Sequence, residues 1–121
     1  MGRLNLDEIK EQFQLMNDFT ENREMISNKM TKFANIIDRE FDNGFGKFLF
    51  ERVPLEDVKG VDSKFSELSA IKNEMMVLAN AKGVNNLGRI TELAKSFISK
   101  SNELSEYFDK IFDYYEEYNL Q

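Results

Sequence analysis

The chain has 121 residues, a formal net charge of −6 at pH 7, and no Cys, His or Trp. The missing residue types exclude a disulfide, a thiol nucleophile, a Ser-His-Asp triad and an imidazole ligand for haem or zinc. The acidic balance argues against non-specific nucleic-acid binding and against docking on an anionic membrane. One proline and six glycines, all placed at the ends of periodic segments or between them, predict a single all-helical domain over residues 1–121.

The first predicted helix runs from about Leu6 to Asp42. Asn5 and Glu8 have the spacing of a capping box at its start. Apolar residues then recur at alternating spacings of three and four, which predicts one buried face. A polar patch at 20–24 interrupts this pattern and predicts a bend, a supercoil stutter or a face that leaves the core. The apolar positions are Leu6, Ile9, Phe13 and Met16, and then Ile26, Met30, Phe33, Ile37 and Phe41.

A stretch rich in glycine and phenylalanine follows at 42–50. Asn43 and Gly44 tolerate the left-handed conformation of a helix end, so the first helix is predicted to stop there. So much aromatic area in a short connection predicts a structural corner that packs into the bundle. A phosphate-binding loop needs wider glycine spacing and a Ser or Thr after the Lys, and this stretch has neither. The predicted corner residues are Phe45, Gly46, Lys47 and Phe48.

Two further helices are predicted in the second half of the chain. Pro54 is predicted to open a short helical turn, Pro54–Lys59, which Gly60 ends. The next helix is capped by Asp62 or Ser63 and runs to Gly83. The last helix is capped by Asn85 or Asn86 and ends near Tyr118. It keeps a heptad register at Ile90, Ala94, Phe97, Ser101, Leu104, Phe108, Ile111, Tyr115 and Tyr118.

Together these elements predict an all-α, antiparallel up-down bundle of three long helices and one short helix. The first and last helices are long for so short a chain, and covering their overhang predicts a dimer. A cluster of tyrosines on the acidic last helix predicts an interaction surface. Its members are Tyr107, Tyr114, Tyr115 and Tyr118.

Three segments carry a resemblance to a known family: Asn43-Gly44-Phe45-Gly46-Lys47-Phe48, Phe65-Ser66-Glu67-Leu68 and Ser101-Asn102-Glu103-Leu104. Their order and spacing resemble the chemoreceptor zinc-binding (CZB) domains, which are four-helix bundles that regulate bacterial chemoreceptors and diguanylate cyclases. In that family a Cys, two His on a later helix and a His on the first helix bind zinc. The resemblance implies a degenerate member without zinc, because the matching positions hold Asn43, Lys72, Met76 and, on the first helix, Phe13.

The expected function is therefore that of a cytoplasmic, non-enzymatic regulatory or sensory module in bacterial signalling, of the chemoreceptor or cyclic-dinucleotide type. It is expected to need no cofactor or metal and to act by protein–protein interaction, with itself or with a signalling protein, without nucleic acid and without inserting into a membrane. The alternative is a small phage-encoded or secretion-associated binding protein that acts through its acidic, tyrosine-rich C-terminal helix. The sequence does not predict a ligand, the identity of the partner or the organism.

Overall fold

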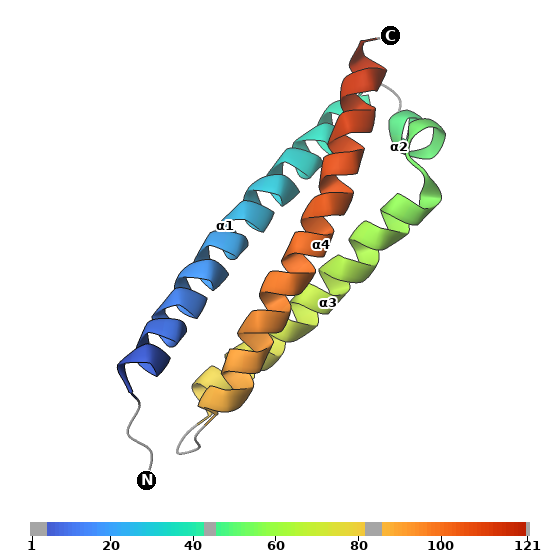
Figure 1. Ribbon diagram of the computed structural model, residues 1–121. Coiled ribbons are helices and arrows are strands. Elements are labelled where there is room, and N and C mark those ends of the chain that lie inside the picture. Colours follow the sequence, from blue (N-terminus) through green and yellow to red (C-terminus); the bar gives the residue numbers. More distant parts are fainter. Residues whose placement is uncertain (1–4, 43–45, 82–85, 121) are drawn as a thin grey trace.

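The structure, a computed structural model, describes residues 5–42, 46–81 and 86–120, and these residues form helices and connections without a strand. The all-helical fold predicted from the sequence is confirmed for them. Three helices are long and one is short, as Figure 1 shows. They are α1 (Leu6–Asp42), α2 (Lys47–Arg52), α3 (Leu55–Asn80) and α4 (Leu87–Asn119).

The last helix, α4, is the one on which the others pack. It contacts α1, α3 and α2, whereas α1 and α3 lie on two sides of it and scarcely contact each other (Figure 1). The heptad register predicted for α4 is confirmed, because its inner positions are buried and its two end positions are half-buried. The buried ones are Ala94, Phe97, Ser101, Leu104, Phe108, Ile111 and Tyr115, and Leu93, which lies outside the predicted register, is buried as well.

Polar contacts between the helices fix their relative directions. In the contacts between α1 and α4, higher residue numbers of α1 pair with higher residue numbers of α4, so the two helices run in the same direction. These pairs are Gln12–Thr91, Asn22–Ser101 and Lys29–Asp109. In the contacts between α3 and α4, higher residue numbers of α3 pair with lower residue numbers of α4, so these two helices run in opposite directions. These pairs are Asp57–Tyr114, Lys64–Glu103 and Glu74–Arg89.

The start of α1 is capped as predicted. The Glu8 backbone N–H donates to Asn5 Oδ1 at 2.8 Å, and the Asn5 N–H donates to Glu8 Oε2 at 3.4 Å. These reciprocal bonds satisfy two of the backbone donors that a helix leaves unpaired at its N-terminus.

Along its length, α1 carries two apolar faces that point in different directions. Ile26 and Ile36 are buried against the rest of the bundle. A second set, which we call the N-terminal stripe, is exposed. It consists of Leu6 (66% exposed), Ile9 (37%), Phe13 (63%) and Met16 (63%). At ~100° per residue, the stripe is turned by roughly two-fifths of a helical turn from the buried face. The burial predicted for these four residues is therefore wrong, and their exposure fits a face that leaves the core, one of the three explanations for the interruption at 20–24.

The short helix is not where the sequence predicted it. The structure places it at α2, inside the aromatic stretch, and the predicted turn Pro54–Lys59 belongs to one continuous α3 that passes through Gly60. Asp62 and Ser63, the predicted caps, therefore lie in the interior of α3. Gly60 does not end a helix. A Cβ built there would overlap Cε1 of Tyr107, so the glycine allows α3 and α4 to approach closely.

This close approach predicts an unusual response to Gly60→Ala. In a helix interior Ala is normally favoured over Gly by roughly 0.5–1 kcal/mol. Here the new methyl group collides with the Tyr107 ring, so Gly60→Ala is expected to destabilise the wild-type chain and to stabilise a Tyr107→Ala chain. Urea denaturation of the four variants of this double-mutant cycle measures the coupling. The same sign in both backgrounds would refute it.

At the start of α4, Asn86 occupies the predicted cap position but makes a different bond. Its side-chain Nδ2 donates to the Leu78 carbonyl near the end of α3, at 3.3 Å, and it makes no capping bond to α4. The asparagine therefore ties the end of one helix to the start of the next.

Candidate functional site

An open groove of about 960 Å³ runs between α1 and α3, above one face of α4. Its floor is part of the core, where Ile26, Leu68 and Phe97 are 4–6% exposed. Because α1 and α3 pack on α4 and not on each other, no helix of the described chain closes the groove from above. It therefore lies where a four-helix bundle would hold its remaining helix.

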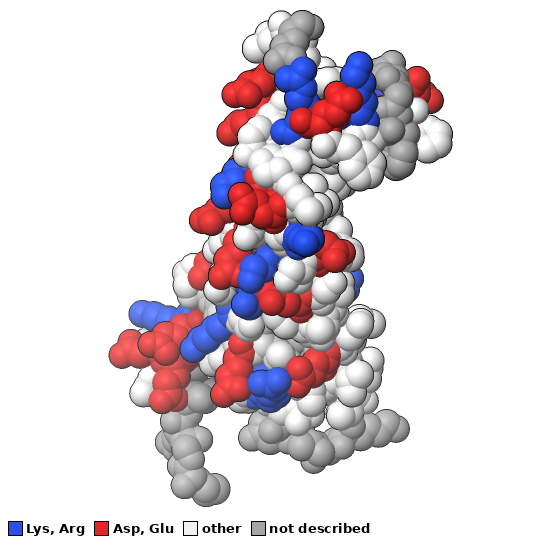
Figure 2. Space-filling view, turned by 90° about the vertical axis from the view of Figure 1, so that its right-hand side faces the viewer, with Lys and Arg blue, Asp and Glu red and all other residues white. Residues whose placement is uncertain are grey.

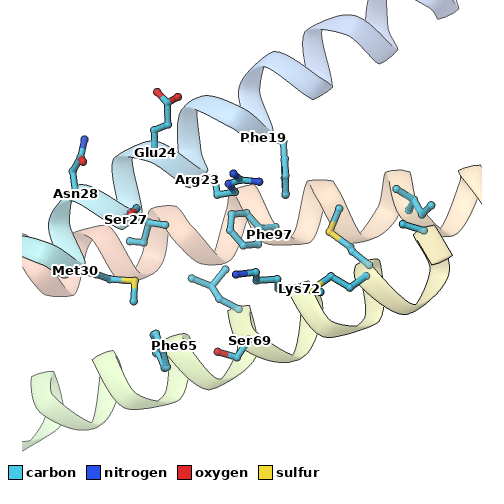
Figure 3. A pocket seen from close by; sticks show the side chains of 16 residues that line it. Phe19, Arg23, Glu24, Ser27, Asn28, Met30, Phe65, Ser69, Lys72 and Phe97 are labelled. Carbon is cyan, nitrogen blue, oxygen red and sulfur yellow. The ribbon is translucent and has the colours of Figure 1, made fainter.

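Apolar side chains line both walls of the groove (Figure 3). Phe19 and Met30 come from α1, and Phe65, Met75 and Met76 come from α3. On the α3 wall, Phe65 is 42% exposed and Met76 is 54% exposed. Flexible methionine side chains adapt to differently shaped apolar partners. The groove thus offers an apolar surface with adaptable walls.

Two cations enter this apolar groove from opposite walls. Figure 3 shows Arg23 of α1 and Lys72 of α3 reaching into the space between the helices, whereas Glu24 points outward from α1. Within the described residues, Arg23 and Lys72 have neither an ion pair nor a hydrogen bond. A ligand that carries acidic groups beside apolar ones would suit this pair of free cations.

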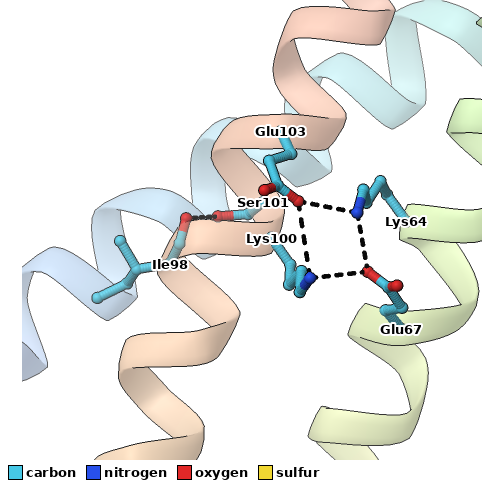
Figure 4. Close-up of polar contacts among 6 residues, drawn as sticks. All are labelled: Lys64, Glu67, Ile98, Lys100, Ser101 and Glu103. Atoms are coloured by element: carbon cyan, nitrogen blue, oxygen red, sulfur yellow. Dashed lines mark hydrogen bonds and ion pairs between the residues drawn. The ribbon is translucent and has the colours of Figure 1, made fainter.

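In contrast, the contact between α3 and α4 carries paired charges. Lys64 and Lys100 alternate with Glu67 and Glu103 in a closed set of ion pairs (Figure 4). The shortest joins Lys64 Nζ to Glu103 Oε2 at 3.0 Å. The Lys64 ammonium lowers the pKa of the Glu103 carboxyl, and Glu103 in turn raises the pKa of Lys64. Figure 2 shows acidic and basic side chains intermixed on this side of the molecule, beside a largely uncharged area.

These pKa shifts predict an acid-sensitive link between α3 and α4. A carboxyl whose pKa is lower in the folded state stabilises the fold above its ordinary pKa, and that stability is lost as the pH falls through the lowered value. The urea midpoint is therefore expected to fall between pH 7 and pH 3, and to fall less in Lys64→Met. The exposed Lys59→Met serves as the matched control. An identical pH dependence in both variants would show that the pair contributes nothing.

The predicted corner is partly described. Gly46 adopts a left-handed conformation with φ +88° at the start of α2, and a Cβ there would lie 2.6 Å from Cδ2 of Phe50. Phe48 is fully buried, with its ring centroid 5.0 Å from that of Tyr115. Lys47 is exposed, and Phe45 lies outside the described residues. Gly46 and Phe48 thus have structural roles that fit the predicted corner.

Of the positions that the family resemblance relates to zinc, Phe13, Lys72 and Met76 lie within the described residues. Lys72 and Met76 lie one turn apart in the groove wall and are exposed, and Asn43 lies outside the described residues. Phe13 and Asp42, the residue before Asn43, belong to one helix and stand ~43 Å apart along it, at ~1.5 Å per residue. Phe13 therefore lies far from the C-terminal end of α1.

The four tyrosines make contacts inside the chain. The Tyr114 O–H donates to Oδ2 of the buried Asp57 at 3.2 Å, and burial together with this carboxylate raises the pKa of Tyr114. The ring of Tyr107 lies against Gly60. Tyr115 is buried, and Tyr118 is half-buried beside Phe48. That they also form an interaction surface stays a prediction.

Comparisons with protein-family models, curated proteins and solved structures found no match to this chain. Among the described residues, no group of three or more Asp or Glu side chains is placed to hold a metal ion. None of the described helices contains a stretch both long and apolar enough to span a membrane.

The sequence pattern alone did not single out the groove. Phe65 and Arg23 were not predicted as site residues, although the shift of the apolar stripe on α1 held the relevant signal. Arg23 lies in the polar patch that interrupts the stripe. In the structure it stands between the N-terminal stripe and the buried face, where α1 forms the groove wall.

Proposed function

We propose that this protein is a non-enzymatic helical interaction module, an antiparallel up-down bundle of three long helices that functions as a dimer. It acts by presenting the groove between α1 and α3 to an amphipathic helix supplied from outside the chain. As the resemblance to CZB domains implies, its setting would be regulatory or sensory signalling in the bacterial cytoplasm.

One observation carries this proposal: the two outer helices pack on α4 without packing on each other. They leave an apolar floor and two exposed apolar walls. An amphipathic helix with apolar residues at spacings of three and four matches such a groove. Acidic residues beside its apolar face would meet Arg23 and Lys72.

The alternative binding role, through the acidic, tyrosine-rich end of α4, has less support. Tyr114 and Tyr115 are engaged by Asp57 and Phe48 within the chain. A partner at this end of α4 would have to contact the outer edges of side chains that already hold α2 and α3 in place. The groove requires no such rearrangement.

A photo-crosslinking side chain at Ser27, on the α1 wall of the groove, tests the proposal in cells. The adduct is expected to map to a segment with an apolar heptad face, and to be lost when Arg23→Glu reverses the charge in the groove. The same side chain at the exposed Ser99 of α4 serves as the control. Equal labelling from both positions, or no adduct from Ser27, would count against the groove as the binding site.

A further inference from the structure

We propose that the helix that covers the α1 wall of the groove is the first helix of a second copy of this chain. This inference rests on the proposed function and names its partner. Two α1 helices pack antiparallel about a two-fold axis near residue 18, so that the N-terminal stripe of each copy covers the α1 wall of the other copy's groove.

The seam for this contact already exists on α1. The N-terminal stripe continues at the same alternating spacing of three and four into residues that face the groove. The residues that line the groove are Arg23, Ser27 and Met30, and Thr20 connects them to the stripe at the same spacing. A strict heptad repeat drifts slowly around a straight helix, which is why the seam begins away from the core and ends in the groove wall. Such a repeat is the pattern by which two helices pack on each other.

One register places large side chains against small or flexible ones. With the axis near residue 18, the two-fold operation pairs Leu6 with Met30, Ile9 with Ser27, Phe13 with Arg23, and Met16 with Thr20 of the other copy. Stripe residues that are 37–66% exposed in the single chain would then be covered. The Phe13 ring would lie against the partner's Arg23 guanidinium, which is a favourable cation–π contact.

Charge complementarity supports the same register. The segment that carries the stripe also carries Asp7, Glu8 and Glu11, with Lys10 as its single cation, so it brings net negative charge toward the Arg23 side of the groove. In the heptad, Lys10 and Glu24 flank the seam at equivalent positions, and antiparallel packing pairs such positions across the interface. Within the described residues, neither has an ion pair in the single chain. Two equivalent Lys10–Glu24 pairs would form in the dimer.

Disulfide trapping tests the register directly, because the chain contains no other Cys. Ile9→Cys combined with Ser27→Cys, oxidised by oxidised glutathione, is expected to give a covalent dimer. The two sites are ~27 Å apart within one helix, so they cannot bridge internally. Ile9→Cys combined with Ser99→Cys, on α4, is the matched control. This variant should form covalent dimer only at the background level. Equal trapping in both variants would overturn the register.

Charge exchange provides a second test that does not depend on the introduced cysteines. Lys10→Glu and Glu24→Lys are each expected to weaken the dimer about ten-fold in sedimentation equilibrium, and the double variant to restore it. Phe13→Asp is expected to weaken the dimer by about 100-fold or more. Because all three side chains are exposed in the single chain, circular dichroism should show that each variant is still folded.

The outcomes separate this inference from the proposed function. A Ser27 adduct on residues 6–16 of a second copy of this protein supports both the further inference and the proposed function. A monomeric chain whose Ser27 adduct lies on another protein's helix overturns the second copy as partner and leaves the groove as a helix site. A monomer that carries a small apolar molecule in native mass spectrometry, with no protein adduct, overturns both.

Discussion

Replacing Phe48 by alanine is expected to lower the free energy of unfolding by about 3–5 kcal/mol. The Phe48 side chain is fully buried, and its ring packs on those of Tyr115 and Tyr118, at centroid distances of 5.0 and 5.4 Å. It anchors α2, a helix of only six residues, to the end of α4. Guanidinium denaturation followed by circular dichroism measures the loss.

The neighbouring Phe50 provides a matched control within the same short helix. Its side chain is 86% exposed, so Phe50→Ala is expected to change stability by no more than about 0.5 kcal/mol. Similar losses for the two variants would mean that α2 does not dock on α4 through Phe48.

The second large effect is expected at the centre of α4. Leu104 is 0% exposed and belongs to the core cluster with Ile26 of α1 and Leu68 of α3. Leu104→Ala therefore leaves a cavity where both outer helices meet α4, and the expected loss is about 3–4 kcal/mol. Thermal denaturation with calorimetry measures it.

Leu55→Ala, at the exposed start of α3, makes the same chemical change without a cavity, because Leu55 is 66% exposed. It should shift the melting temperature little. If Leu104→Ala were as mild, α4 would not be the helix that holds α1 and α3 together.

Periodicity predicted the parts of the fold that one helix decides by itself. The heptad of α4 gave its buried positions, and the spacing of Asn5 and Glu8 gave the cap of α1, since both depend on residues within a few turns. The prediction of where the short helix ends and the next helix begins was wrong, because Gly60 resembles a helix stop in sequence. Its real role depends on the Tyr107 ring, which approaches from a distant segment.

The candidate groove was less predictable for the same reason. Its apolar walls come from α1 and α3, which are neighbours only because both pack on α4. The spacing of apolar residues within one helix does not predict which other helices lie beside it. The exposed N-terminal stripe was visible in the sequence as an apolar pattern, but a pattern does not state which partner covers it. Lys72 and Met76 were singled out through a family resemblance, and the structure places both in the groove wall.

The distance between the α1 helices of two copies tests most directly the claim that they pack on each other. Nitroxide labels on Asn17→Cys, an exposed position beside the proposed two-fold axis, would report it by pulsed electron paramagnetic resonance of the full chain. Helices that pack in contact have axes about 8–10 Å apart, so we expect a label separation of about 10–20 Å. A chain that gives no intermolecular distance, or a dimer whose labels lie beyond about 40 Å, would contradict the pairing of α1 with its copy.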